Sequence, residues 1–350
     1  MKLLSGFSLI LIVSLALSGC DHGYTSRAFS SSTLVFDCSS TATNNGTTSC
    51  VPAGSGGGGT TPTDPTNGAS QITTDNYVVL AEKVSAQIDR LVRHRSGNPP
   101  PLTELALLLL QRIQDDTVVV CTNNPNYITI SETTGGATAG TNYRVDFDSN
   151  DGCDIDGIPT RGSLDISGFD PNAVGGPLTG NGTWNTAANI SIGSLSFEVS
   201  PDLTEVFVGD FGITITNDTA TITTQLTMTN LILAETNTGA STSDTFTTGT
   251  LISADDTNNL GINIFNTTIN NTSVTQSTLN VTSSANPSPL TWDKNSTSDN
   301  PFQGSLFVTA SDNSSTLSLI ANDANTMTVL LNNSESSCAT WANINPGACP

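Results

Sequence analysis

The sequence predicts an α+β protein, mostly β, in which two N-terminal helices pack on one face of a large bent antiparallel sheet or partly open barrel. Apolar residues recur at helical spacing in only two segments, both before residue 116. After residue 117 the hydrophobic period changes to two, and clusters of Asn, Asp, Ser and Gly separate the alternating runs. Such runs are typical of antiparallel strands that bury one face.

The first 19 residues predict a secretory signal peptide. Lys2 provides a positive charge, residues 3–17 are apolar, and the small residues Ser18 and Gly19 precede Cys20. The apolar run is shorter than the roughly 20 residues that a membrane-spanning helix needs. We therefore expect segment 1–19 to be cleaved off.

The motif Leu17-Ser18-Gly19-Cys20 resembles the lipobox of bacterial lipoproteins. The resemblance implies that Cys20 becomes the first residue, carries acyl chains such as palmitate, and anchors the protein in a membrane of the bacterial cell envelope, facing the periplasm or the cell surface. Several acyl chains on one residue anchor stably, because each buried methylene contributes about 0.8 kcal/mol. In enterobacterial lipoproteins an Asp at the next position signals inner-membrane retention, and Asp21 lies there. The choice between inner and outer membrane stays open.

Residues 20–70 predict a lipidated flexible tether. The segment is rich in Ser, Thr, Gly, Asn and Pro and includes GSGGGGTTPTDPTNG, a composition that buries too little apolar surface to fold. One island interrupts it, TLVFDCSSTATNNGTTSCV at 33–51. A β-prone run, an Asn-Gly turn signal and two cysteines there indicate a stapled hairpin or loop.

Two helices are expected, at about 74–96 and 102–115. The first carries an apolar stripe made of Tyr77, Leu80, Val84, Ile88 and Leu91. The second, LTELALLLLQRIQDD, is apolar almost all round and too short to cross a bilayer. We expect it to be buried against the sheet, with contact to a membrane surface as the alternative.

Alternating runs after residue 117 predict the strands. The run 189–199 alternates, and its parity changes at Gly193 as a β-bulge would cause. In 219–233, the apolar parity contains Ile222, Leu226, Met228 and Ile232. Similar alternation predicts strands within 211–218, 261–269, 277–284, 304–312, 315–323 and 326–333. We assign 71–350 to one disulfide-stapled β-rich domain. A division near 170–185, around DPNAVGGPLTGNG, is the alternative.

Seven cysteines are an odd number, and lipidation of Cys20 would leave six. In an oxidising compartment these six are disulfide candidates. They fall along the chain as three local couples: Cys38 with Cys50, Cys121 with Cys153, and Cys338 with Cys349. We expect this sequential pairing. A zinc site is disfavoured because no C-x-x-C spacing occurs and the histidines are His22 and His94.

The densest acidic cluster is DFDSNDGCDIDG at 146–157. Its candidate ligands for calcium are Asp146, Asp148, Asn150, Asp151, Asp154 and Asp156. The D-x-D-x-N start suits hard oxygen coordination of Ca²⁺, but Gly152 is one position late and Gly157 stands where a calcium loop places its Glu. The simpler interpretation is a hairpin in which Val145 and Phe147 face the core and SNDG makes the turn.

Charge and composition disfavour several functions. The net charge is −21, and from Gly162 onward 16 acidic residues face a single base, Lys294. Such a surface repels phosphate backbones, so we expect no nucleic-acid partner. The scarcity of histidine, and the absence of G-x-S-x-G and of Walker A spacing, leave no recognisable catalytic motif. His94, with Arg90, Arg93 and Arg95, is expected to complement the dipole at the end of the first helix.

The segments YRVDFDSNDGC and RGSLDIS, and the later PLTWDKNSTSDNPFQGSLFVTASD with a closing Trp, resemble uncharacterised β-rich lipoproteins of Gram-negative bacteria. The resemblance implies an envelope lipoprotein and no particular activity. We expect a non-enzymatic, lipid-anchored envelope protein of structural or binding type, held by its membrane anchor and working with an envelope protein, lipid or glycan partner. The alternatives are a periplasmic carrier of lipid or another hydrophobic ligand, and a glycan-binding or glycan-processing module.

Overall fold

The computed structural model describes residues 36–37, 51–52, 72–93, 98–133, 141–148, 150–180, 182–237, 240–271, 277–283, 289–296, 300–323, 326–332 and 335–339. The chain divides into two units, Met1–Pro65 and Thr66–Pro350. In the first unit, β1 (Phe36–Asp37) pairs antiparallel with β2 (Val51–Pro52). β1 lies within the island 33–51 in which a hairpin or loop was predicted, and β2 lies at its end, while Cys38 and Cys50 themselves lie outside the described residues.

The second unit contains one antiparallel sheet of 15 strands. Its first members are β3 (Ile128–Thr133), β4 (Thr141–Phe147), β5 (Cys153–Ile155), β6 (Ile158–Phe169), β7 (Trp184–Ser200), β8 (Leu203–Asn217), β9 (Thr221–Asn237) and β10 (Ala240–Asp256). The remainder are β11 (Asn259–Asn271), β12 (Ser277–Ser283), β13 (Leu290–Asp293), β14 (Ser305–Ala310), β15 (Thr316–Asp323), β16 (Thr326–Leu331) and β17 (Glu335–Ala339).

The strand order follows the chain. It runs β3-β4-β6-β7-β8-β9-β10-β11-β12-β14-β15-β16-β17, with β5 beside β6 and β13 beside β11. Because the path is linear through the described strands, the sheet is open, as in the first of the two predicted forms. β6 and β7 pair with one another on either side of residues 170–183, so one sheet continues past the point where a division was the alternative.

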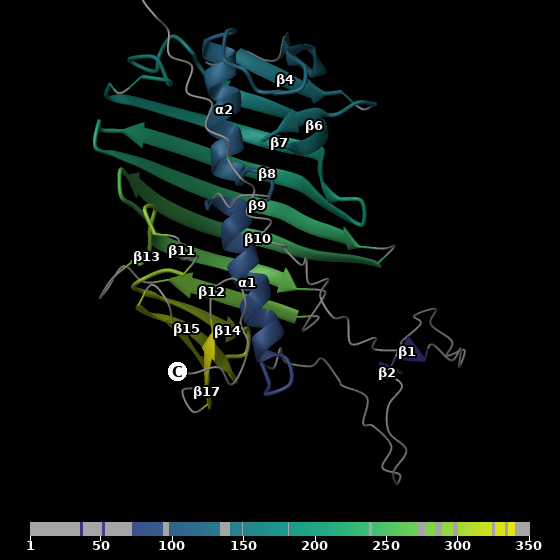
Figure 1. Cartoon of the computed structure of the whole chain (residues 1–350), viewed down its shortest axis with the longest axis vertical. Helices are drawn as coiled ribbons and strands as arrows, with labels where there is room; N and C mark the ends of the chain where they lie inside the picture. Colours follow the sequence, from purple (N-terminus) through teal and green to yellow (C-terminus); the bar gives the residue numbers. More distant parts are fainter. Residues whose placement is uncertain are drawn as a thin grey trace, which may run out of the picture. The chain divides into compact units, whose positions relative to one another are not determined.

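Two helices lie on one face of this sheet, as predicted. They are α1 (Tyr77–Leu91) and α2 (Leu102–Gln114), so the first helix ends five residues earlier than expected and the second one residue earlier. Figure 1 shows them one after the other along the same face, with their axes crossing the strands, α2 over the β4–β7 end and α1 over the β10–β14 end. The predicted stripe of α1 is entirely buried. A short 3-10 helix, Pro125–Tyr127, precedes β3.

Burial alternates along most of the length of the central strands. In β7 the side chains of Trp184, Ala188, Ile190 and Ile192 are buried while the residues between them, such as Asn189 and Ser191, are exposed. The apolar parity faces the helices and forms one core with α1 and α2. The other parity, rich in Thr, Asn and Ser, faces solvent, which is the half-buried arrangement expected of an antiparallel sheet.

β-Bulges lie in three of four neighbouring strands, β7, β9 and β10 of the run β7 to β10, and we call them the bulge row. In β7 the bulge is at Gly193, where the pairing with β6 and β8 slips, which confirms the prediction. In β9 the extra residue is Asn230, with φ of 53°, and in β10 the register against β11 shifts at Thr247. Bulges bend strands and increase their twist, so the row bends the sheet.

The Asn230 bulge also corrects one predicted core position. Beyond it the parity of β9 changes, so Leu231 and Leu233 are buried and Ile232 is only half-buried. The prediction that Ile232 shares the core face with Leu226 was therefore wrong, because it assumed an uninterrupted strand.

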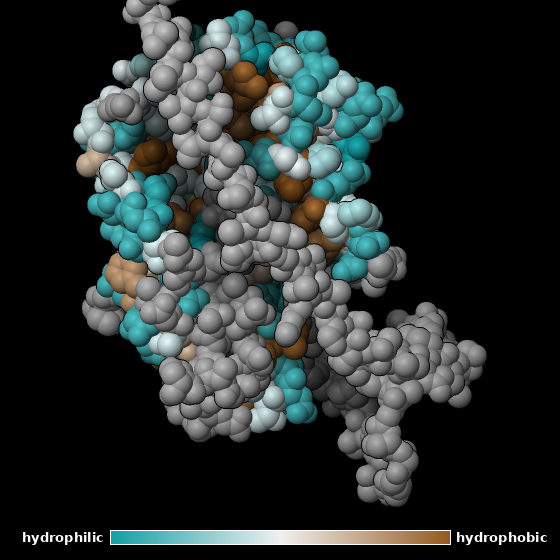
Figure 2. Space-filling view, in the orientation of Figure 1, coloured by the Kyte–Doolittle hydropathy of each residue, from teal (hydrophilic) through white to brown (hydrophobic). Residues whose placement is uncertain are grey.

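Figure 2 views the molecule from the helix side, where apolar side chains are visible among hydrophilic ones. On α2, Leu107 and Leu108 are partly buried against the core, and on α1 Val79 is 46% exposed. Neither α1 nor α2, the α-helices within the described residues, is long and apolar enough to cross a membrane.

Candidate functional site

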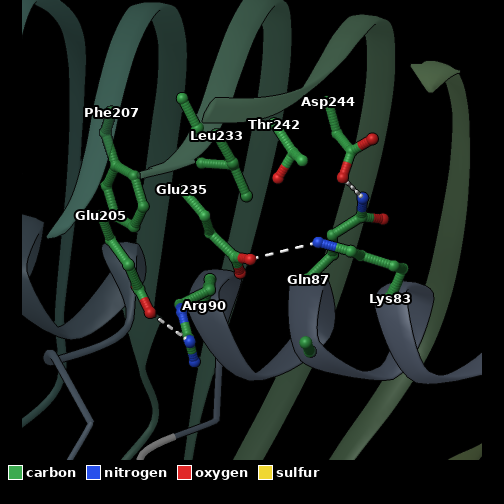
Figure 3. Close-up of a pocket in the computed structure, with 11 residues that line it drawn as sticks. Lys83, Gln87, Arg90, Glu205, Phe207, Leu233, Glu235, Thr242 and Asp244 are labelled. Carbon is green, nitrogen blue, oxygen red and sulfur yellow. Dashed lines mark hydrogen bonds and ion pairs between the residues drawn. The ribbon is translucent and has the colours of Figure 1, made fainter. Parts of the chain in front are cut away.

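Six polar side chains meet between α1 and the sheet (Figure 3). We call them the α1 cluster. The sheet contributes three carboxylates from adjacent strands: Glu205 from β8, Glu235 from β9 and Asp244 from β10. The helix contributes the other three from one side: Lys83, Gln87 and Arg90. Their spacing of four and three residues places them on a common face of α1.

Each helix side chain of the cluster contacts one sheet carboxylate. Arg90 forms an ion pair with Glu205. The Lys83 Nζ lies 3.1 Å from Glu235 Oε2. The Gln87 Nε2 donates a 2.7 Å hydrogen bond to Asp244 Oδ2. Three contacts to three neighbouring strands fix both the position of α1 along the sheet and its rotation.

Burial makes this cluster electrostatically unusual. Glu205 is 1% exposed and Asp244 is 6% exposed, whereas Lys83 and Glu235 lie nearer the solvent. Burial raises the pKa of Glu205 because the charged form loses hydration, and the ion pair with Arg90 opposes this effect only in part. Burial likewise raises the pKa of Asp244, against the hydrogen bond from Gln87. The nearby Glu235 adds to both increases through charge repulsion.

Three buried atoms of the cluster have no hydrogen-bond partner among the described residues. They are Gln87 Oε1, Arg90 Nε and Glu205 Oε2. A cavity of about 20 Å³ lies between the same residues, bordered by Phe207 and Leu233. This space admits about one water molecule, which needs polar partners of this kind.

The geometry of the α1 cluster suits attachment of α1 to the sheet better than it suits a substrate site. A substrate pocket usually measures about 300–1,000 Å³, far above the 20 Å³ between α1 and the sheet. A carboxyl with a raised pKa is found in catalytic sites, but buried ion-pair networks perturb pKa values as well. Since its three helix side chains each contact a carboxylate of a different strand, we interpret the cluster as the set of contacts that holds α1 on the sheet.

A second charged group lies at the end of α1. Arg93 Nη1 contacts Asp89 Oδ1 at 3.1 Å, both side chains are buried, and the Arg93 guanidinium lies 5.4 Å from the ring centre of Trp292 in β13. We expected Arg90 and Arg93 to serve the helix dipole. The structure gives both of them carboxylate partners: Glu205 of the sheet for Arg90, and Asp89 of α1 itself for Arg93. His94 and Arg95 lie outside the described residues.

The α1 cluster was missed in the sequence, although a signal was present. Glu205 has the same parity as the buried Phe207, and Asp244 has the same parity as the buried Phe246. A charged residue at a strand position that points into the core needs a buried partner. The matching signal in α1 is the polar stripe at 83, 87 and 90 beside the apolar one.

The acidic segment 146–157 folds differently from the predicted hairpin. Val145 and Phe147 are buried as expected. However, β4 and β5 do not pair with each other, since both pair with β6. The true hairpin joins β5 to β6 through Asp156 and Gly157, whose φ angles of 52° and 84° are those of a two-residue turn.

The candidate calcium ligands have separate local roles. Asp146 pairs with Arg144, and Asp148 accepts hydrogen bonds from the backbone N–H groups of Asn150 and Asp151. Those bonds lower the pKa of Asp148. The N–H of Asp154 donates to Asn123. Within the described ranges no three Asp, Glu, His or Cys side chains converge as metal ligands, so calcium binding stays a prediction without a formed cage behind it.

One predicted disulfide is present. Cys121, between α2 and β3, is bonded to Cys153 of β5, with 5.0 Å between their Cα atoms. It joins the segment before the edge strand to the sheet. Cys338 lies in β17, while Cys20, Cys38, Cys50 and Cys349 lie outside the described residues, so those two couples and the lipidation site stay predictions.

Comparison with protein-family models, with curated proteins and with solved structures gives no match for this chain.

Proposed function

We propose that this protein is a lipid-anchored protein of the bacterial cell envelope that works as a binding or structural module, without catalysis. The observation that carries the proposal is the filled inner face of the sheet. Its inward side chains pack against α1 and α2, and the α1 cluster leaves room for about one water molecule there. The surfaces on which a partner could bind are then the polar outer face of the sheet and the edges of its strands.

The lipobox motif supports the anchoring half of the proposal. Residues 1–19 read as a signal peptide, and Cys20 stands where the lipidated cysteine belongs. The Cys121–Cys153 bond fits an oxidising compartment outside the cytoplasm. The acidic surface would be repelled by anionic lipids, so attachment would depend on the acyl chains.

The carrier alternative requires a different state of the molecule. A lipid carrier needs an apolar cavity that a ligand can reach. Here Leu80, Ile88 and Leu109 occupy the inner face with 0% exposure. Lipid would enter only if α1 or α2 left the sheet, and for α1 this means breaking the Arg90–Glu205 ion pair. For this reason we place the carrier second.

Cell fractionation tests the anchor. The full chain should sediment with membranes and incorporate an alkyne analogue of palmitate, and Cys20→Ser should abolish the labelling. Cys38→Ser is the matched control, because it removes a cysteine while leaving the lipobox intact. Equal labelling of the wild type and of Cys20→Ser would overturn the anchor.

Native mass spectrometry tests the binding-module interpretation against the carrier. The chain carrying Cys20→Ser should appear as a bare polypeptide, lighter by six hydrogens for three disulfides. A co-purifying lipid-sized mass would instead support the carrier. Adding a calcium chelator checks the acidic segment, because bound Ca²⁺ would be lost as about 40 Da.

A further inference from the structure

The outer face of the sheet, opposite α1 and α2, carries a groove of about 280 Å³. We call it the outer groove. Four neighbouring strands, β6 to β9, supply its polar lining: Ser167, Asn189, Ser191, Asp210, Gly212 and Thr229. Ile190 and Phe211, whose side chains are buried on the inner face, also border it.

The outer groove follows the bulge row. Ser191 precedes the Gly193 bulge, Asp210 comes directly after Gly209, and Thr229 comes directly before Asn230. A Cβ on Gly209, which has φ of 113°, would lie 2.2 Å from the Asn230 carbonyl oxygen, so the two backbones approach more closely than a side chain would allow. Bulges are common beside binding sites because they redirect neighbouring side chains.

Gly212 opens the groove. Its φ is not in the left-handed region, so its backbone does not require glycine. A Cβ there would lie 3.4 Å from Asn189 Oδ1 and 3.9 Å from Thr227 Cβ, which is ordinary contact. Because Gly212 has no side chain, it leaves a depression in a sheet face that other side chains cover.

The lining has hydrogen-bonding capacity that the protein does not use. Within the part of the chain that the structure describes, the side chains of Asn189, Ser191, Asp210 and Thr229 form no hydrogen bond with another residue. Amide, carboxylate and hydroxyl groups together donate and accept, as a polyhydroxylated ligand requires. Asp210 is the one charged group in the lining, which disfavours an anionic ligand, and no metal-ligand cluster is found in the described ranges.

Polar side chains continue across the sheet from the groove. In direct cross-strand register lie Asp210, Thr229, Thr248, Thr268, Asn280 and Thr309, from β8 to β14. Neighbouring strands are about 4.8 Å apart. The row therefore extends well beyond one sugar ring and suits an extended chain.

We propose that the outer groove, with the row that continues from it, is a binding site for a neutral glycan chain. The groove takes one ring at Gly212, the Asn189 amide and the Asp210 carboxylate bond its hydroxyls, and the Thr and Asn row contacts the following rings. This inference rests on the binding role proposed above and adds the class of ligand.

Calorimetric titration of the full chain with neutral hexasaccharides tests the site. The chain is purified in a detergent without a sugar headgroup, so that the result does not depend on lipidation. The probes are chitohexaose, cellohexaose, maltohexaose, mannohexaose and laminarihexaose. Binding of chitohexaose would indicate a glycan with the N-acetylated backbone of the cell wall, and binding of the others a polysaccharide from elsewhere.

We expect at least one hexasaccharide to bind, and Gly212→Val and Asn189→Ala each to raise its Kd by about tenfold or more, equivalent to about 1.4 kcal/mol. Thr216→Val is the matched control. It lies on the same face of β8, four residues along and outside the groove lining, and should keep the wild-type Kd. Thermal unfolding verifies that each variant is folded.

Two results would overturn the site: no hexasaccharide binds the wild type, or Gly212→Val binds as the wild type does. In either case the fractionation experiment still decides the anchored envelope role by itself. The titration thus tests the glycan site, and the fractionation tests the anchored role independently of it.

Discussion

Glu205 is an ionisable residue on the buried face of β8. The cost of burying its carboxylate depends on the partner that α1 provides, which is Arg90. The Glu205 side chain is 2% exposed and that of Arg90 is 15% exposed. The pair Lys83–Glu235, about two turns of the helix away, has side chains that are 24% and 39% exposed. The two ion pairs share a helix and differ in burial, so they form a natural comparison.

Arg90→Met should lower the free energy of unfolding by about 3–5 kcal/mol, because it leaves a buried carboxylate without its partner. Lys83→Met is the control and should cost at most about 1 kcal/mol, because water screens its more exposed partner. Urea unfolding of both variants measures the difference. Equal losses would show that burial does not distinguish the two pairs.

The pH dependence of stability provides a second test at this scale. The pKa of Glu205 is raised above its ordinary value of 4.5, and that of Asp244 above 3.8, because both are buried. The folded state therefore binds protons that the unfolded state has lost. The stability that these protons provide is complete below the ordinary carboxyl pKa and is lost as the pH rises through the raised values.

We expect the wild type to lose stability, relative to the double variant Glu205→Gln and Asp244→Asn, as the pH rises from about 4 to 8. Urea midpoints across this range measure the difference between the two proteins. Glu132→Gln, on the exposed part of β3, is the control and should follow the wild type. A difference that grows in favour of the wild type with rising pH would contradict the sign.

At the scale of elements, glycine decides where the strands bend. Gly162 in β6 has φ of 114°, and a Cβ there would lie 1.9 Å from the Ser194 carbonyl oxygen in β7. By contrast, Gly182, before β7, has no left-handed φ, and a Cβ there would meet nothing within 4 Å. The two positions therefore separate the effect of a bulge contact from that of a glycine as such.

Gly162→Ala should reduce the free energy of unfolding by about 3 kcal/mol, from the left-handed φ and the backbone clash together. Gly182→Ala should leave it unchanged or slightly higher, because it only restricts the unfolded chain. Urea unfolding of the two variants checks this. A Gly162→Ala protein as stable as the wild type would mean that β6 and β7 do not approach so closely.

Hydrophobic periodicity predicted some features of the helices and strands and missed others. The apolar stripe of α1 predicted its buried face, and the parity change at a glycine located the Gly193 bulge. The Asn230 bulge escaped prediction because Asn occurs in exposed strand positions as well as in the left-handed region. The pairing of β5 with β6 escaped it too, since the sequence contains two DG turn signals five residues apart, at 151–152 and 156–157.

At the scale of the whole molecule, the long sheet leaves β3 as an edge strand. The Cys121–Cys153 bond closes a loop with a sequence separation of 32 that contains β3 and β4. It therefore restrains the end of the sheet where pairing is available on one side only.

Replacing both Cys121 and Cys153 by Ala should lower the free energy of unfolding by about 3–4 kcal/mol, the loop-closure effect for this separation. Replacing the pair together leaves no free thiol to form a wrong bond. Urea unfolding measures the loss. If the double variant unfolds at the wild-type midpoint, the bond contributes no stability to the folded domain.

Hydrophobic periodicity and cysteine spacing are local properties of the chain, so they were enough to predict the class of fold, the order of helices before strands, the buried face of α1 and one cysteine pair. Which distant residues meet depends on how the strands are arranged in the folded sheet. Glu205, Glu235 and Asp244 are up to 39 residues apart in sequence and become neighbours because β8, β9 and β10 are adjacent in the sheet. The outer groove arises in the same way, from bulges aligned across strands whose register no single strand specifies.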